Sequence, residues 1–160
     1  LIGCGLRLGY CVAPKPIVEK LSKIDFGPSP SHLSAITVHE YLRNHMDEHI
    51  SKVRESLKTK RDAMLDALEV HFPTNCTWNQ PEGGMMLWVR LPENSNTLIA
   101  LDKAVEFNVK YNPGTVFRSD RSGENYMRLT YSHNSPSEIY DGIEILSEVF
   151  RREGIFSLQG

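Results

Sequence analysis

The sequence predicts an α+β fold, in which helices pack on a small sheet of three or four strands. Apolar residues recur at helical spacing through a long region from about 34 to 72. Two later segments, 85–91 and 126–131, have the composition of strands instead. A strong helix start follows at 135–138. The second half of the 160-residue chain therefore mixes strands with helices.

The N-terminal region predicts one strand and one short helix. Apolar residues alternate with others over 6–12, which is typical of a strand, and Pro14 and Pro16 end it. Pro16 also suits the first turn of a helix over 17–24. The segment Gly27-Pro28-Ser29-Pro30-Ser31 then predicts a linker. Because no partner strand lies beside 6–12 in the sequence, we expect that strand to belong to another sheet.

A long helix is expected from about Ser34 to Phe72, and Pro73 ends it. The stretch 44–47 is weak in helix formers, which allows a break there. A basic run within the helix predicts a solvated face, with an anion site as the alternative. Its members are Lys52, Arg54, Lys58, Lys60 and Arg61. The apolar positions at helical spacing are Leu42, Met46, Ile50, Val53, Leu57, Met64 and Leu68.

The remaining elements follow in short succession. A strand over 85–91, a helix over 97–107, a short strand over 109–111 and a strand over 126–131 are expected. The last helix has a capping box, with Ser135 as N-cap, Pro136 at the first position and Glu138 bonding back. Its expected core face comprises Ile139, Ile143, Leu146 and Phe150, and Gly154 is placed to end it.

Composition excludes several classes of protein. Eighteen Lys and Arg against 20 Asp and Glu leave a net charge of −2, which removes the electrostatic case for a dedicated nucleic-acid binder. No apolar run approaches the roughly 20 residues of a membrane span. Three scattered cysteines without a CxxC pair predict neither a disulfide framework nor a zinc cluster, so a reducing cytoplasm is expected. The chain opens on Leu1 in a glycine-rich apolar stretch, and we expect a segment of a longer protein.

Motifs for metal binding and nucleophilic catalysis are weak. His45 and His49 have the spacing of a helical metal pair, but no third ligand is evident, and no metal is expected. No Gly-x-Ser-x-Gly elbow occurs, and the glycines at 3, 5 and 9 do not form a dinucleotide fingerprint.

Two arginines in apolar strand-like segments are the stronger candidates. Arg7 lies in Gly5-Leu6-Arg7-Leu8-Gly9-Tyr10, and Arg128 lies in Met127-Arg128-Leu129-Thr130-Tyr131. A guanidinium among apolar groups is costly unless an anion pairs with it, and its planar fork matches carboxylate and phosphate. The alternative is that each side chain points to solvent from an alternating strand.

Five motifs together carry a family resemblance. They are Gly5-Leu6-Arg7-Leu8-Gly9-Tyr10 with Ala13-Pro14, Pro81-Glu82-Gly83-Gly84-Met85-Met86-Leu87-Trp88-Val89, Pro113-Gly114-x-x-Phe117, Met127-Arg128-Leu129-x-Tyr131, and Glu138 to Leu146. In this order they resemble the C-terminal part of fold type I, pyridoxal-phosphate-dependent class I/II aminotransferases, on the branch with 2-aminoadipate, aromatic and branched-chain aminotransferases. The resemblance covers nearly the whole chain.

The resemblance implies a fold, a division into domains and a partner. Residues 34–160 would form the small C-terminal domain, with a long interdomain helix and a short, mainly antiparallel sheet covered by helices. Residues 1–33 would be a linker and the tail of the large cofactor-binding domain, including its leftover strand. The parent protein would be a cytoplasmic homodimer that acts on α-amino acids and 2-keto acids in amino acid metabolism.

Site residues follow from the same resemblance. Arg7 matches the arginine that binds the phosphate of pyridoxal 5′-phosphate, and Arg128 matches the arginine that binds the substrate α-carboxylate. Gly83 and Gly84 match glycines that approach the substrate site, with Gly84 as the expected substrate contact. The Schiff-base lysine would precede Leu1, so no catalytic residue is expected in these 160 residues, and the chain alone should be inactive.

Two other functions stay open at this level. The same domain occurs as the effector-binding part of transcriptional regulators, and a stand-alone interaction domain is a further alternative. The Gly-Gly pair before the strand that holds Trp88 favours the enzyme.

Overall fold

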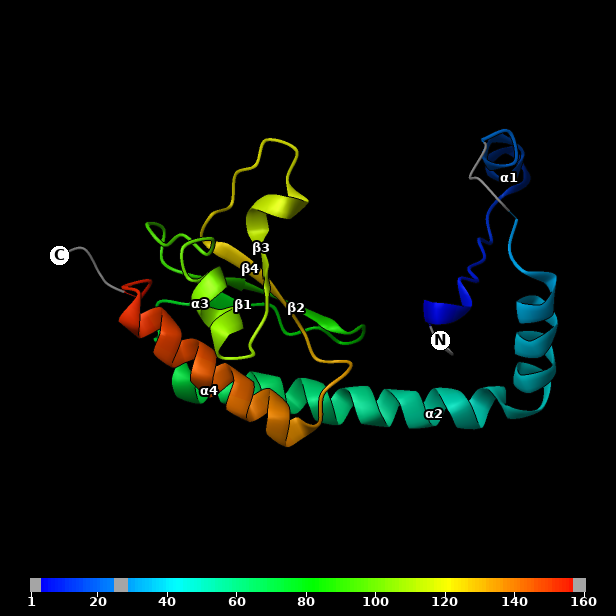
Figure 1. Ribbon diagram of the computed structural model, residues 1–160. Coiled ribbons are helices and arrows are strands. Elements are labelled where there is room, and N and C mark those ends of the chain that lie inside the picture. Colours follow the sequence, from blue (N-terminus) through cyan, green and yellow to red (C-terminus); the bar gives the residue numbers. More distant parts are fainter. Residues whose placement is uncertain (1–3, 25–28, 157–160) are drawn as a thin grey trace. The chain divides into compact units, whose positions relative to one another are not determined.

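The structure is a computed structural model of residues 1–160 and describes residues 4–24 and 29–156 (Figure 1). The chain divides into two units, Leu1–Val53 and Arg54–Gly160. This division lies inside a long helix, whereas the predicted domain boundary at 33/34 lies near the start of that helix and stays a prediction. The elements are η1 (Cys4–Leu6), α1 (Lys15–Leu21), α2 (His32–His71), β1 (Thr77–Trp78), β2 (Met86–Arg90), α3 (Leu101–Glu106), β3 (Asn112–Pro113), η2 (Gly114–Phe117), β4 (Tyr126–Thr130) and α4 (Pro136–Arg152).

The first unit lacks the predicted strand over 6–12. Residues 7–14 have no regular structure, and the side chains of Tyr10 and Val12 are 92% and 88% exposed. A strand needs a neighbour to bond its backbone, and no strand is described in 4–24 or 29–53. The short helix is confirmed as α1, with a proline in its first turn. Residues 27 and 28 of the predicted linker lie outside the described part.

The long helix is confirmed as α2, and the helix is continuous across 44–47, where a break was allowed. The apolar residues at helical spacing differ in burial along α2. Of the seven positions at helical spacing, Met64 and Leu68 are buried, and those from Leu42 to Leu57 are not. The C-terminal third of α2 therefore contributes to the core.

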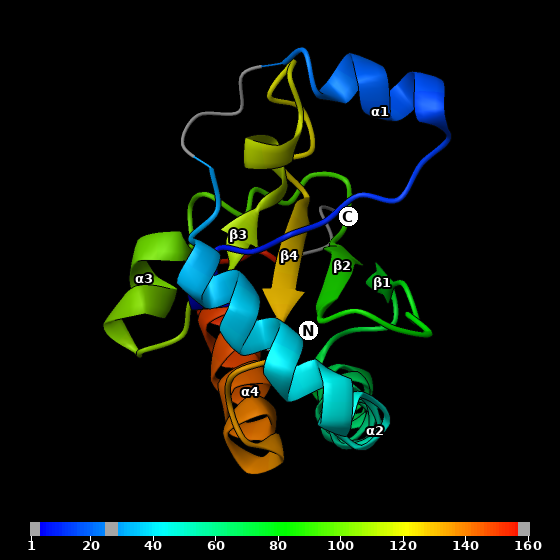
Figure 2. The ribbon, with the colours of Figure 1, turned by 90° about the vertical axis from the view of Figure 1, so that its right-hand side faces the viewer.

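The second unit contains a four-stranded antiparallel sheet in the order β1-β2-β4-β3, which confirms the predicted α+β class (Figure 2). Its two central strands are the predicted ones. The sequence did not indicate β1. The strand predicted over 109–111 is wrong, because none of its residues is in a strand and the other edge strand, β3, covers only Asn112–Pro113. Val109 is still tied to the preceding helix, because its backbone N–H donates to the Ala104 carbonyl.

The helix predicted over 97–107 is confirmed only for its second half, α3. Thr97 does not join this helix, because its polar groups bond to another segment. Its backbone N–H and its hydroxyl both donate to the Glu124 carbonyl, and the hydroxyl also lies within bonding distance of the Tyr126 carbonyl. These bonds tie residue 97 to the segment that leads into β4, so the helix begins later.

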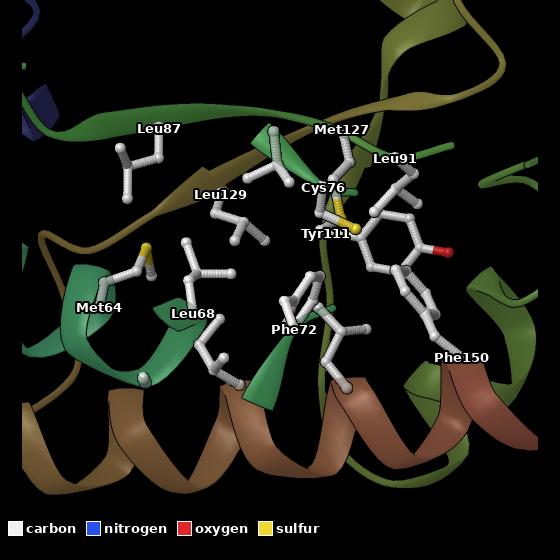
Figure 3. Close-up of a cluster of buried hydrophobic side chains, with 14 of the residues drawn as sticks. Met64, Leu68, Phe72, Cys76, Leu87, Leu91, Tyr111, Met127, Leu129 and Phe150 are labelled. Atoms are coloured by element: carbon white, nitrogen blue, oxygen red, sulfur yellow. The ribbon is translucent and has the colours of Figure 1, made fainter. Parts of the chain in front are cut away.

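The core lies between one face of the sheet and two helices, α4 and the end of α2 (Figure 3). Leu87 and Val89 of β2 and Met127 and Leu129 of β4 face it. The helical side chains opposite them include Met64, Leu68, Ile139, Ile143, Leu146 and Phe150. The predicted core face of the last helix is therefore confirmed.

The predicted ends of α4 are also confirmed. The hydroxyl of Ser135 accepts from the Glu138 backbone N–H at 3.3 Å, and the Glu138 carboxylate accepts from the Ser135 backbone N–H at 2.7 Å. Hydrogen bonds from the Ser135 hydroxyl and then its backbone N–H hold the pKa of the Glu138 carboxyl below its usual range. Gly154, with φ +69°, follows the last turn.

Each unit contains a free thiol. Cys11, in the first unit, is exposed, and Cys76, in the second unit, is buried. Within the described residues, no helix is long and apolar enough to span a membrane.

Candidate functional site

Strand alternation gives the sheet a second face, opposite the core. Along β2 and β4, odd-numbered residues are buried, whereas even-numbered ones are half-buried or exposed. We call the second face the open face. Its members on the two central strands are Met86, Trp88, Arg90, Tyr126, Arg128 and Thr130.

Arg128 lies at the centre of the open face. It is half-buried and pairs in register with Trp88 on one side and Asn112 on the other. Its Nε is buried without a hydrogen-bond partner, and its side chain makes no ion pair with a described residue. Leaving a buried charged donor unsatisfied costs more than the roughly 1–3 kcal/mol of a neutral group. Arg128 is therefore suited to an anion supplied from outside the described residues.

One aromatic ring, that of Phe117, contacts this guanidinium, and two further rings lie next to it on the open face. Its central carbon lies 4.4 Å from the centroid of the Phe117 ring. Trp88 contacts Phe117 edge to face at 5.6 Å and stacks on Tyr126 at 5.7 Å. Arg118 lies 5.6 Å above the Tyr126 ring. The open face thus combines cations with aromatic surface, and no described carboxylate pairs with Arg128.

The turn before Phe117 depends on a glycine. A Cβ atom at Gly114 would lie 2.5 Å from the Gly123 carbonyl oxygen and 2.7 Å from the Tyr126 Cβ. Only a residue without a side chain permits this approach of η2 to the start of β4. The Pro113-Gly114 motif therefore sets where Phe117 lies.

Gly84, the expected substrate contact, lies elsewhere in this unit. Its φ of +87° favours glycine, but a Cβ at Gly83 or Gly84 would meet no atom within 4 Å. No close approach to the glycine pair is therefore seen within the described residues. The pair borders a hollow of about 540 Å³ whose other lining residues are Arg54, Leu57, Lys58, Arg61, Glu82 and Tyr131.

Most cations of the basic run on α2 bind other groups of the protein. Lys52 pairs with Glu48 at 2.6 Å, and Lys60 donates to the Ser132 and His133 carbonyls. Lys58 and Arg61 both bind Asp62. The bonds from Lys58 and then Arg61 keep the pKa of Asp62 below its usual range. Because these cations have protein partners, the run fits a solvated and structural face better than an anion site.

Arg7, the expected phosphate ligand, lies in the first unit. Its side chain is exposed, and it makes no ion pair with the described residues. Its φ of +50° is in the left-handed region, which a non-glycine residue adopts at a cost of about 1 kcal/mol or more. Added Cβ atoms at its neighbours Gly5 and Gly9 would meet nothing within 4 Å. A phosphate therefore has room to approach Arg7.

The histidine pair shows no metal geometry. Tyr41 lies 3.2 Å from the Nδ1 of His49 through its hydroxyl and 5.2 Å from the His45 ring by centroids. Over 4–24 and 29–156, no group of three His, Cys, Asp or Glu side chains could hold a metal ion.

Sequence reasoning placed Arg128 correctly on a strand but gave no role to Phe117. The signal for Phe117 was the Pro113-Gly114 pair three residues before an aromatic residue. That pair predicts a turn, but a sequence does not say which strand the turn folds against.

Comparisons with known proteins find one family model and several relatives. The family model "Aminotransferase class I and II" matches residues 4–146. The aromatic-amino-acid aminotransferase 1 of Thermococcus litoralis is 35% identical over 156 residues, which is 96% of this chain and 37% of that protein. The uncharacterized HTH-type transcriptional regulator YdfD of Bacillus subtilis is 33% identical over 143 residues, covering 87% of this chain and 29% of the regulator.

A solved structure is similar over almost the same range. LysN, the α-aminoadipate aminotransferase of Thermus thermophilus, superposes with a TM-score of 0.85 at 30% identity. The match covers 94% of this chain and 39% of that one, which was solved with N-(5′-phosphopyridoxyl)-L-leucine. The chain thus spans about two fifths of the length of these aminotransferases.

Proposed function

Because this chain belongs to the class I and II aminotransferase family, whose cofactor is pyridoxal phosphate, we propose that it serves an enzyme that moves an amino group between an α-amino acid and a 2-keto acid. The carrying observation is Arg128, a half-buried guanidinium with an unpartnered Nε on the open face. An α-carboxylate is a planar anion common to every substrate of such an enzyme, and it matches the fork of an arginine.

Arg128 would act by binding and orienting. Its guanidinium nitrogens hold the α-carboxylate in a bidentate pair, which fixes the rotation of the substrate about its α-carbon. Fixing that rotation removes orientational freedom before the reaction and so lowers the barrier. The bound cofactor supplies an electron sink for the α-carbon. The carboxylate displaces water from the guanidinium. The rings of Trp88, Tyr126 and Phe117 border the site on the open face.

Arg7 fits the cofactor's phosphate in charge and in access. It is exposed, without an ion pair among the described residues, and between two glycines with open space around them. We assign it the phosphate and assign Gly84, at the hollow along α2, a place near the substrate. The proposal includes a cytoplasmic homodimer, and the free thiols Cys11 and Cys76 suit a reducing compartment.

The test is substitution of Arg128 in the cofactor-loaded enzyme that contains this chain. Arg128→Ala should raise KM and lower kcat/KM for amino donors about 10- to 150-fold, as expected for losing a charge-assisted bond of about 1.5–3 kcal/mol. Arg118→Ala is the matched control, because Arg118 also lies over a ring of the open face but is exposed. Unchanged kinetics in Arg128→Ala would contradict the assignment.

A second candidate function is favoured by one observation, the 33% identity to an HTH-type regulator. There the same arginine would hold the carboxylate of an effector without turnover. Binding of an amino acid that depends on Arg128, in a protein that transfers no amino group to a 2-keto acid, would identify this case.

A further inference from the structure

We infer that Phe117 is a positioning residue, whose ring holds the Arg128 guanidinium ready for a carboxylate. The inference rests on the proposed function of Arg128 and adds a residue to it. Phe117 lies at the end of η2, outside the sheet, and its ring centroid is 4.4 Å from the central carbon of the guanidinium. That distance is well within the range of a cation–π contact.

The ring is the only described group that interacts with the guanidinium in an oriented way. Among the described residues, no carboxylate pairs with it and no hydrogen bond runs from its side chain. An arginine side chain has about 2 kcal/mol of rotamer entropy to lose when it is fixed. Without the ring, that ordering cost would fall on ligand binding, because no other described group holds the side chain in place.

An aromatic ring suits this task better than an acidic residue. A carboxylate beside Arg128 would neutralise the charge and occupy the donors that a substrate needs. The face of a ring attracts the cation through its quadrupole but accepts no strong hydrogen bond from it. Phe117 can therefore stabilise the charged side chain and leave its nitrogens for the substrate.

Phe117 is itself held from two sides. Trp88, the cross-strand neighbour of Arg128, contacts its ring edge to face at 5.6 Å. The tight approach at Gly114 fixes the start of the turn that carries it. The ring nonetheless stays 43% exposed, so burial in the core does not explain an aromatic residue here.

A second exposed phenylalanine provides a matched control. Phe107 is 46% exposed and has Arg152 at 5.9 Å from its ring centroid. It follows α3 and is not part of the open face, and no role in binding is assigned to it. Phe107→Leu therefore removes an exposed ring and a cation–π contact without touching Arg128.

The experiment follows the Nε–H resonance of Arg128 by NMR in the 160-residue chain with labelled arginine, and Arg128→Lys assigns it. Sodium acetate, the simplest carboxylate that resembles the substrate group, is the probe. We expect acetate to shift this resonance in the wild type. Phe117→Leu should weaken acetate binding about two- to fivefold, as a cation–π contact of about 0.5–1 kcal/mol predicts. Phe117→Tyr should restore it, and Phe107→Leu should bind as the wild type does.

The outcomes separate the two claims. If acetate leaves the Arg128 resonance of the wild type unmoved, the carboxylate role of Arg128 fails, and the inference fails with it. If the wild type responds and Phe117→Leu binds acetate equally well, only the inference is overturned. Equal weakening in Phe117→Leu and Phe107→Leu also overturns it. Core methyl resonances of Leu87 and Leu129 establish that each variant is folded.

Discussion

Gly114 shows how one missing side chain can fix the position of a site. A Cβ there would enter backbone and side-chain atoms of the segment that begins β4, within 2.5–3.0 Å. We expect Gly114→Ala to lower the free energy of unfolding by about 1–3 kcal/mol, the usual cost of overpacking. Gly142→Ala is the control, since a Cβ there meets nothing within 4 Å and alanine favours the interior of α4. Urea denaturation of both variants tests this, and equal stabilities would refute it.

The two described thiols should differ in reactivity. Burial raises the pKa of Cys76 to about 11, whereas Cys11 is exposed. Because the thiolate is the reactive form, iodoacetamide at about pH 8, near the ordinary thiol pKa, should label Cys11 and spare Cys76 in the folded chain. Labelling in urea, followed by peptide mass mapping, is the control. Rapid labelling of Cys76 without denaturant would contradict the burial.

The raised pKa of Cys76 makes the free energy of unfolding depend on pH. The folded chain holds the Cys76 proton more tightly than the unfolded chain does, so this contribution is complete below the ordinary thiol pKa and is lost as pH rises toward 11. Burial, and secondarily the charge of Asp102, raises the pKa of Tyr111 too. The free energy of unfolding, measured by urea denaturation across a pH series, should therefore decline above about pH 9. A free energy that stays constant from there to pH 11 would contradict this expectation.

At the scale of an element, α2 has one periodicity and two environments. Leu68 is fully buried, whereas Met46, on the same helical pattern, is 46% exposed. We expect Leu68→Ala to cost about 2–5 kcal/mol of stability and Met46→Ala well under about 1 kcal/mol. Chemical denaturation measures both changes. A Met46→Ala cost as large as that of Leu68→Ala would mean that the first part of α2 is packed.

The elements also show what a sequence can predict. β2 and β4 were predictable because their apolar residues alternate and because each strand has the other as its hydrogen-bonding partner. α4 was predictable because its capping box lies within four consecutive residues. The segment 6–12 has the same alternation but no strand beside it among the described residues, so the pattern alone did not produce a strand. The start of α3 at Leu101 instead of Thr97 comes from the long-range bonds of Thr97, which no local pattern encodes.

At the scale of the whole molecule, the two units differ in their interiors. Every buried hydrophobic residue of the described chain lies in Arg54–Gly160. We expect limited proteolysis to leave a resistant fragment that begins near residue 54 and contains the sheet and α4. Mass spectrometry of the products gives the cleavage sites. Early cleavage within β2 or β4 would contradict the expectation.

The candidate site was predictable in part, for a reason that concerns the whole fold. Arg128 is conspicuous in the sequence because a charge stands in an apolar strand, and the strand's own alternation puts it on a face. Phe117 precedes it in the chain and reaches it only through the turn at Gly114 and the closing of β3 on β4. Phe117 is a neighbour of Arg128 only in the folded structure, and no local sequence pattern indicates the contact.

The even and odd positions of β2 and β4 have a consequence for how such a protein diversifies. If the open face binds the ligand as proposed, substitutions at 86, 88, 126 or 128 should alter binding, whereas those at 87, 89, 127 or 129 should alter stability. Residues that face the proposed ligand and residues that form the core therefore alternate along the same two strands. A lineage can retune or abandon its ligand while keeping its scaffold, which suits a domain whose relatives include both aminotransferases and regulators.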